Sequence, residues 1–217
     1  MRQNSIFRKV AATEPEPWVI ADAVKVLKKG GLVVFPTTGL YGLGADALNP
    51  AAVERVYRAK QRASAKPILV LIAEIPELKK LCTEVTKTAA GLMGLFWPGR
   101  LTVVVKARPD LPGVLTGGTG KIGIRMSRHP VARSLVKAFG GPVTATSANL
   151  SGQKGCAAVA KLDPGITGAV DLVLDAGPLK GDIGSTVVDA TTERPVVLRE
   201  GAISKKRLAM AGFDVDI

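Results

Sequence analysis

Short runs of branched apolar residues constrain the fold of this chain more than any other feature. The clearest of these runs lie at residues 32–35, 68–72 and 101–105, and residues 122–126 also read as a strand. Each has the length and composition of a buried β-strand. Apolar residues at helical spacing occur between them, as at Ile20, Val24 and Leu27. The alternation of the two patterns indicates an α/β protein.

The order of these patterns predicts one mixed sheet flanked by helices. Helices are expected at residues 18–29, from Asn49–Pro50 onward, around 75–81 and 84–95, from His129–Pro130 to 139, and at 204–210. Further strands are expected at residues 143–146, 172–174, 187–188 and 196–198. Helices alternate with strands early and strands dominate late, which favours a twisted mixed β-sheet over a doubly wound one. We expect a single domain over residues 1–217, with its core at about 14–208.

The composition suits a cytoplasmic protein with an aliphatic core. Of the 217 residues, 47% are hydrophobic but only 4% are aromatic, so Val, Leu, Ile and Ala must fill the core. Cys82, Cys156 and His129 stand apart in the sequence. A zinc site needs three or four such ligands, so we expect no protein-held metal. No signal peptide or spanning run is recognisable, and we expect a reducing, cytoplasmic location without a membrane partner.

The net charge of +12 predicts anionic partners such as a nucleotide, RNA or acidic lipid. General solubility from dispersed lysines explains the same charge. The position of the cations must therefore decide between these interpretations.

A cluster of cations lies in and after the second expected helix. It comprises Arg55, Arg58, Lys60, Arg62 and Lys66. In an extended chain, Lys60 and Arg62 would point to the same side because they are two residues apart. Such a pair suits the binding of a triphosphate. A solvated helix face is the competing interpretation.

Two polar loops follow expected strands. Residues 36–44 read PTTGLYGLG, and residues 146–152 read TSANLSG. Ligands of α/β sheets often bind where strands end. Thr37 in the first loop, and Ser147 and Asn149 in the second, offer hydroxyl and amide groups to a polar ligand. Ordinary glycine, Ser/Thr and Asx turns are the competing interpretations.

Two arginines leave apolar strands, Arg125 after residues 122–124 and Arg199 after 196–198. A buried guanidinium is costly unless it is paired. A carboxylate or phosphate ligand would pair with it, and so would a structural Asp or Glu.

One glycine motif is rejected. Gly118-x-Gly120-x-x-Gly123 matches the dinucleotide-binding pattern in its letters. That pattern must follow a strand and begin a helix, whereas this one precedes an expected strand. We interpret it as a flexible loop.

Seven segments in order resemble the YrdC-type threonylcarbamoyl-AMP synthase family in its short form. They are PTTGLYGLG (36–44), AKQR (59–62), FWPGRLTVVV (96–105), IRMSRHP (124–130), TSANLSG (146–152), GSTVVD (184–189) and LREGAI (198–203). The resemblance implies a YrdC-like fold with a large basic concavity. It also implies an L-threonylcarbamoyladenylate synthase, a nucleotidyltransferase that makes threonylcarbamoyl-AMP and pyrophosphate from L-threonine, bicarbonate and ATP. The product would serve N6-threonylcarbamoyladenosine modification of tRNA next to the anticodon, through downstream transfer proteins.

The resemblance also implies roles for single residues. Lys60 and Arg62 would be catalytic and bind the ATP triphosphate, and Mg²⁺ would be held mainly by the phosphates. The expected ATP-binding residues are Lys60, Arg62, Ser147, Asn149 and Arg199. The expected threonine-binding residues are Thr37, Arg125, Ala145 through its main chain, and Ser185. The chain departs from the usual family pattern at Thr38, Gly39, Ala63, Lys66, Leu71 and Arg100.

Two other functions compete with this one. An RNA-binding module for tRNA, rRNA or double-stranded RNA could use the basic concavity without catalysis, although few aromatic residues are available for stacking. A related carbamoyl-adenylate-forming domain of hydrogenase-maturation proteins is the other alternative, but those chains are much longer.

Overall fold

The computed structural model describes residues 5–63, 65–181 and 183–215. Its α-helices are α1 (Pro17–Lys28), α2 (Pro50–Lys60), α3 (Lys87–Phe96), α4 (Gly113–Thr116), α5 (Pro130–Phe139), α6 (Pro164–Thr167) and α7 (Lys205–Met210). Two 3₁₀ helices are η1 (Ile75–Lys80) and η2 (Val159–Lys161). Its strands are β1 (Ile6–Lys9), β2 (Val33–Pro36), β3 (Tyr41–Gly44), β4 (Val70–Leu71), β5 (Leu101–Lys106), β6 (Lys121–Arg125), β7 (Val143–Thr144), β8 (Thr146–Ser147), β9 (Leu172–Asp175), β10 (Thr186–Asp189) and β11 (Val196–Arg199).

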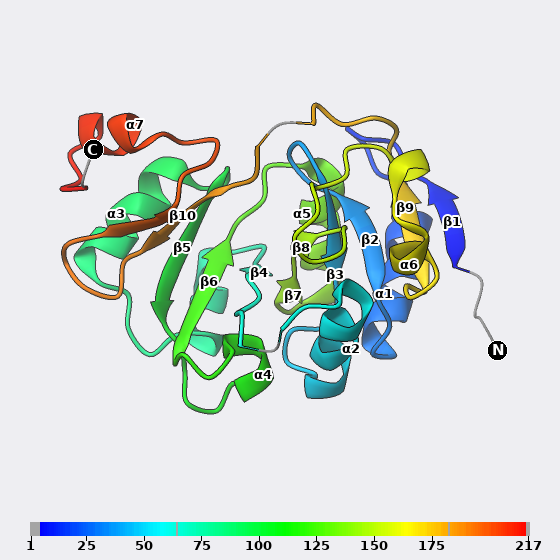
Figure 1. Cartoon of the computed structure of the whole chain (residues 1–217), viewed down its shortest axis with the longest axis horizontal. Coiled ribbons are helices and arrows are strands. Elements are labelled where there is room, and N and C mark those ends of the chain that lie inside the picture. Colours follow the sequence, from blue (N-terminus) through cyan, green and yellow to red (C-terminus); the bar gives the residue numbers. More distant parts are fainter. Residues whose placement is uncertain (1–4, 64, 182, 216–217) are drawn as a thin grey trace.

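The predicted mixed α/β class is confirmed, with the refinement that the strands form two sheets. The first has the order β1-β9-β2-β3-β8, and the second has the order β11-β10-β5-β6-β4-β7. Each contains both parallel and antiparallel pairs. In Figure 1 the first sheet occupies the right half of the view and the second the left half. Apolar periodicity identifies strands but not their partners, and for this reason the division was not predicted.

The segment Val143–Ser147 joins the two sheets. Val143 pairs with Leu71 in the second sheet, and Ser147 pairs with Gly42 in the first. Between them, the Thr144 hydroxyl accepts a hydrogen bond from the Ala45 amide at 2.9 Å. One short piece of chain therefore places its side chains at the boundary between the sheets.

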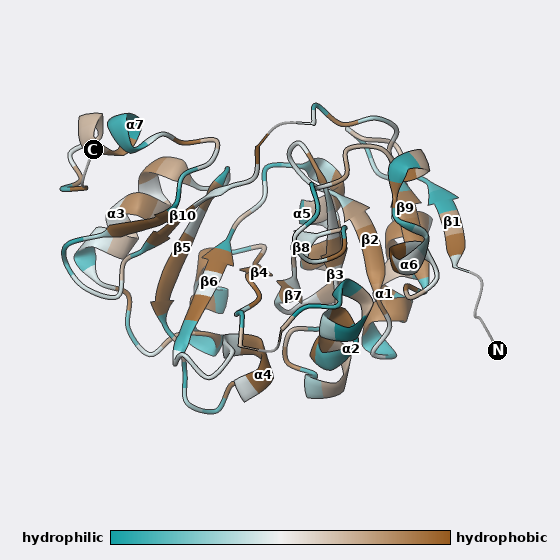
Figure 2. Cartoon of the chain, in the orientation of Figure 1, coloured by the Kyte–Doolittle hydropathy of each residue, from teal (hydrophilic) through white to brown (hydrophobic). Residues whose placement is uncertain are grey.

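Two apolar clusters support this arrangement. In one, α1 and α5 pack against β2 and β9 of the first sheet, and Val19, Leu27, Val33, Leu135 and Leu174 are buried there. In the other, α3 packs against β5 of the second sheet, and α2 packs with α4 and α6. Figure 2 shows hydrophobic residues along β2, β5, β9 and β10 and hydrophilic residues on the outer turns of α2 and α7. As the composition predicted, aliphatic side chains make up most of both clusters.

The helix signals in the sequence were accurate at their starts. The Asn49 side chain accepts a hydrogen bond from the Ala52 amide, and Pro50 is the first residue of α2. The structure adds β1 and β3, which were not predicted. β1 is short and mostly exposed, and the glycines of β3 made the segment look like a loop. No helix among the described residues is long and apolar enough to cross a bilayer.

Gly44 lies where the two sheets approach each other, and it allows a test of this packing. A Cβ atom there would lie 2.6 Å from the Phe35 ring and 2.9 Å from Val143 Cγ1. Gly44→Ala is therefore expected to lower the free energy of unfolding by about 1–3 kcal/mol through overpacking. Denaturant unfolding is the measurement. Gly94→Ala is the control, because nothing lies within 4 Å of a Cβ atom in that helix, and it should stabilise the chain by about 0.5–1 kcal/mol.

Candidate active site

One pocket at the junction of the sheets gathers most of the predicted site residues. We call it the arginine pocket; its volume is about 90 Å³. Its lining includes all four residues predicted to bind threonine and two of those predicted to bind ATP: Thr37, Arg125, Ala145, Ser185, Ser147 and Arg199. They come from loops and strand ends of both sheets. The chain passes repeatedly between the two sheets, and this brings strand ends that are distant in sequence together at the pocket.

Arg125 gives the arginine pocket its charge. Its residue is 7% exposed, and its Nε atom has no hydrogen-bond partner. Burial, followed by the positive charges of Arg100 and Arg199, lowers the pKa of Arg125 to about 10. No carboxylate among the described residues forms an ion pair with it. A buried cation beside two others is unfavourable unless an anion binds, so the pocket is suited to an anionic ligand.

Arg199 is held against Ser185, the residue that precedes β10. Its guanidinium donates to the Ser185 carbonyl oxygen from Nε at 3.2 Å and from Nη2 at 2.7 Å. The Ser185 hydroxyl lies 2.9 Å from the Thr102 hydroxyl. These contacts fix both the cation and the hydroxyl before any ligand arrives.

Thr37 and Ala145 also line the arginine pocket. The Thr37 hydroxyl donates to the Leu40 carbonyl at 2.6 Å, which leaves its oxygen as an acceptor for a ligand. The Ala145 amide donates to the Leu69 carbonyl at 3.0 Å. That N–H group is therefore already used within the fold.

Lys60 does not lie on a solvated helix face, which was the competing interpretation of the cation cluster. It is the last residue of α2 and only 2% exposed. The chain then turns through Gln61, whose φ is 49°, so residues 60–62 are not extended. The prediction that Lys60 and Arg62 point to the same side of an extended chain was therefore wrong. The Lys60 ammonium donates to the carbonyls of Ser147 and Asn149, at 2.5 and 2.6 Å. Lys60 thus holds the backbone of the 146–152 loop.

Asn149 is also turned inward. It is 7% exposed, and its amide nitrogen donates to the carbonyls of Leu150 and Gln153 at 2.6 and 2.9 Å. Its Oδ1 atom is buried without a partner. In this conformation, Asn149 shapes the loop rather than lining the arginine pocket.

Arg62 lies at the edge of a second pocket, which we call the apolar pocket. Its guanidinium donates to the carbonyls of Lys66 and Pro67, and its charge lowers the pKa of Arg199 after the larger effect of burial. The apolar pocket has a volume of about 290 Å³, and its apolar lining comprises Pro67, Ile68, Leu69, Val104, Val187 and Leu198. Leu69 and Thr146 line both pockets, so the two are neighbours.

Sequence reasoning missed three contributors to these pockets. Arg100 was noted only as a departure from a family pattern, yet its charge acts on Arg125. Lys121 and Asp189 were not singled out, although both line the apolar pocket. Strand alternation could have found the last two, because Asp189 is four residues from Ser185 and Lys121 four from Arg125.

Comparison with known proteins identifies the family. Residues 25–201 match the Sua5/YciO/YrdC family model, whose description is "Telomere recombination". The chain belongs to the Sua5/YciO/YrdC family.

Relatives in the Sua5/YciO/YrdC family include the threonylcarbamoyl-AMP synthase of Bacillus subtilis, 38% identical over 190 residues. That match covers 87% of this chain and 55% of the relative. The Pyrococcus abyssi enzyme of the same name is 36% identical over 188 residues, again covering 87% and 55%. The chain therefore spans about half the length of these two relatives.

Solved structures of the Sua5/YciO/YrdC family share the fold. The crystal structure of Pyrococcus abyssi Sua5 complexed with L-threonine has a TM-score of 0.90 and 32% identity, covering 98% of this chain and 63% of that one. The crystal structure of Escherichia coli YciO has a TM-score of 0.80 and 31% identity, covering 91% and 96%.

Proposed function

We propose that this chain is an L-threonylcarbamoyladenylate synthase, which forms threonylcarbamoyl-AMP and pyrophosphate from L-threonine, bicarbonate and ATP. The observation that carries the proposal is the buried, uncompensated cation Arg125 in a pocket with the hydroxyls of Thr37 and Ser185. An amino acid carries a carboxylate for the cation and polar groups for the hydroxyls. Family relatives named threonylcarbamoyl-AMP synthase, and a related structure with L-threonine, support this ligand. A buried small-molecule pocket of this kind favours an enzyme over an RNA-binding module.

The two pockets suggest where each substrate binds. The threonine carboxylate would pair with Arg125 in the arginine pocket. The ATP phosphates would lie beside Arg62, Ser147 and Arg199, where the pockets meet. The nucleoside would extend into the apolar pocket, whose aliphatic lining suits a planar base.

Lys60 contributes in this arrangement mainly through the loop. Its ammonium fixes the carbonyls on either side of Ala148, and this presents Ser147 toward the phosphates. Its positive charge adds to that of Arg62 because the two lie close enough for Arg62 to lower the pKa of Lys60. Both cations would stabilise the negative charge that spreads over the phosphates during the reaction.

The proposed chemistry has two steps. The neutral threonine amine attacks the carbon of bicarbonate, and a carbamate forms with loss of water. Alternatively, the amine attacks CO₂ derived from bicarbonate, and the carbamate forms with loss of a proton. A carbamate oxygen then attacks the α-phosphorus of ATP, and pyrophosphate leaves with the bond electrons. The protein aligns two anions that would otherwise repel each other, which makes positioning and positive charge its main contribution.

Mg²⁺ is proposed to enter as part of the substrate, bound to the ATP phosphates. Among the residues that the structure describes, no group of three or more His, Cys, Asp or Glu side chains could hold a metal ion. The ion would therefore keep water and phosphate oxygens as ligands, as Mg²⁺ commonly does. The activated threonylcarbamoyl group would then pass to tRNA through separate transfer proteins.

The decisive experiment is mass detection of threonylcarbamoyl-AMP after incubation of the purified chain with ATP, L-threonine and bicarbonate. Omitting each substrate in turn should abolish the product. ATP-independent RNA binding by the folded chain, with no product formed, would support the RNA-binding alternative instead.

The charge of Lys60 predicts a pH dependence of the reaction. Burial, and next the charge of Arg62, lowers the pKa of Lys60 to about 8. In the enzyme without ATP, the ammonium therefore loses its proton as the pH rises through about 8. We expect kcat/KM for ATP to fall above that pH, because neutral Lys60 no longer attracts phosphates. The measurement is the pH profile from 6.5 to 9.5, and a flat profile across this range would contradict the role of the charge.

A further inference from the structure

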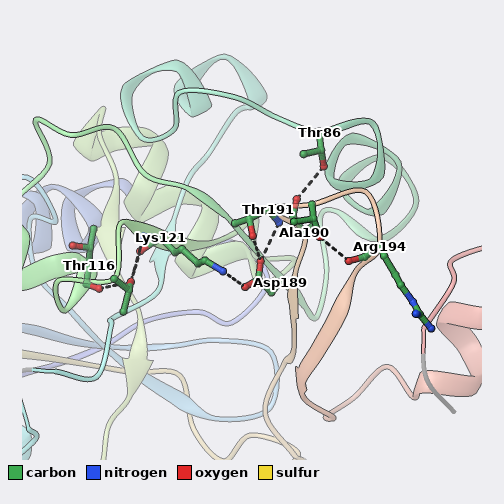
Figure 3. A network of polar contacts seen from close by, with 9 residues as sticks. Thr86, Thr116, Lys121, Asp189, Ala190, Thr191 and Arg194 are labelled. Carbon is green, nitrogen blue, oxygen red and sulfur yellow. Dashed lines mark hydrogen bonds and ion pairs between the residues drawn. The ribbon is translucent and has the colours of Figure 1, made fainter.

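The apolar pocket ends in an ion pair that the chemistry described above does not use. Lys121 Nζ lies 2.6 Å from Asp189 Oδ2 (Figure 3). Both residues line the pocket. The Asp189 side chain is 15% exposed and that of Lys121 is 43% exposed, so the pair is set into the wall but remains accessible from the pocket.

The carboxylate of this pair is held in one orientation. Asp189 Oδ1 accepts hydrogen bonds from the Thr191 amide at 3.0 Å and from the Thr191 hydroxyl at 2.7 Å. Oδ2 is left to face Lys121, as Figure 3 shows. Burial raises the pKa of Asp189, but hydrogen bonds from Lys121 and Thr191 outweigh it and keep the pKa below its usual value. The pair thus presents an ionised acceptor beside a cationic donor.

The strands connect this pair to the arginine pocket. One face of the chain through β10 carries Ser185, Val187 and Asp189, because residues two apart in a strand point to the same side. Ser185 lines the arginine pocket, and Val187 and Asp189 line the apolar pocket. Four residues of strand span about 13 Å. A ligand anchored at the arginines and extended along this face would reach Asp189 with its far end.

The neighbouring strand has a glycine in the wall of the apolar pocket. On β6, Gly123 lies between Arg125 and Lys121 on the same face. A Cβ atom at Gly123 would project toward the Thr102 methyl group at 3.2 Å and Leu69 Cβ at 3.5 Å. The absence of a side chain at Gly123 therefore lets Thr102 and Leu69, which also line the apolar pocket, pack closely over this strand.

We propose that the Lys121–Asp189 pair recognises the purine base of ATP, with Asp189 Oδ2 accepting from the 6-amino group and Lys121 Nζ donating to an adjacent ring nitrogen. The inference rests on the proposed function for placing the nucleotide in this pocket. Adenine presents an amino donor beside a ring-nitrogen acceptor, and the pair presents the complementary acceptor and donor. A hydrogen bond to a charged group in a partly desolvated site contributes measurably to discrimination.

The test compares the binding of ATP with that of purine riboside triphosphate, which lacks only the 6-amino group. Isothermal titration without threonine should show that the wild-type chain binds ATP about tenfold more tightly. In Asp189→Asn, the Thr191 amide should still donate to the side-chain oxygen of residue 189, so the NH₂ group of the new side chain faces the pocket. A donor then replaces the acceptor, and the ratio of the two dissociation constants should fall from about ten to about one.

A second variant keeps the proposal testable if Asp189→Asn does not fold. Lys121→Met should weaken the binding of both nucleotides to a similar degree, because both retain the ring nitrogen that Lys121 would contact. Glu84→Gln is the control, since Glu84 pairs with Lys106 at 3.9 Å outside both pockets, and it should keep the wild-type ratio. An unchanged ratio in folded Asp189→Asn, or unchanged affinities in folded Lys121→Met, would overturn the proposal.

Base recognition and catalysis can fail separately in these experiments. If threonylcarbamoyl-AMP forms but wild-type protein binds both nucleotides equally, base recognition by the pair is wrong and the proposed function stands. If the tenfold ratio is observed but no product forms, the pair stands and the proposed function is wrong.

Discussion

Arg125→Met is expected to lower kcat/KM for L-threonine by about two to three orders of magnitude, because removal of one partner of a buried ion pair typically costs about 2–5 kcal/mol. The substrate carboxylate would enter the arginine pocket without its main counter-charge. The KM for ATP should change only a few-fold, since Arg62 and Arg199 remain. Steady-state kinetics with each substrate varied in turn is the measurement.

The same substitution should leave the unliganded protein folded. Arg125 is buried beside two other cations, and replacing an uncompensated buried charge with an apolar side chain is often neutral or stabilising. The melting temperature without ligands should therefore not fall. Arg133→Met, at an exposed position of α5, is the control and should keep normal threonine use. A large rise in the KM for ATP with normal threonine use would instead place the nucleotide at Arg125.

Lys60→Met is expected to reduce product formation by about three orders of magnitude and to loosen the loop at residues 146–152. The two carbonyls that Lys60 holds would lose their donor, and a buried acceptor without a partner costs about 1–3 kcal/mol. Loss of a desolvated charge offsets part of that cost. We expect a net destabilisation of about 1–3 kcal/mol, whereas an exposed lysine would have given almost none.

Hydrogen exchange of the loop amides, together with the activity assay, separates these effects. Faster exchange at residues 146–152 should accompany the loss of activity in Lys60→Met. Lys66→Met is the matched control, because Lys66 is exposed and close in sequence, and it should change neither. Normal turnover in Lys60→Met would remove Lys60 from the reaction.

The sequence predicted the elements of this fold better than their pairing. Helix starts at Pro17, Pro50 and Pro130 agree with the expected positions to within a residue or two, because proline and capping residues act locally. Strand β3 was missed because its two glycines are tolerated only through tertiary contacts, as at Gly44. Pairing into two sheets depends on contacts between distant segments, which local patterns do not encode.

The site was foreseen in a similar way. The resemblance named the residues that gather in the arginine pocket, and the structure places Thr37, Arg125 and Ser185 together there. Their ligand contacts stay predictions. The orientation of Lys60 was not foreseen, because it depends on how α2 ends at Gln61 and on where a distant loop places its carbonyls.

The way in which the chain alternates between the sheets has a consequence for how it folds. The first sheet needs residues 6–44 together with 146–175, and the second needs residues 70–144 together with 186–199. Cleavage anywhere between Leu71 and Leu172 leaves neither fragment with one complete sheet. Neither half of the chain therefore contains all the strands of one sheet, and neither is expected to fold on its own. We expect slow folding through contacts of high sequence separation, and one cooperative melting transition.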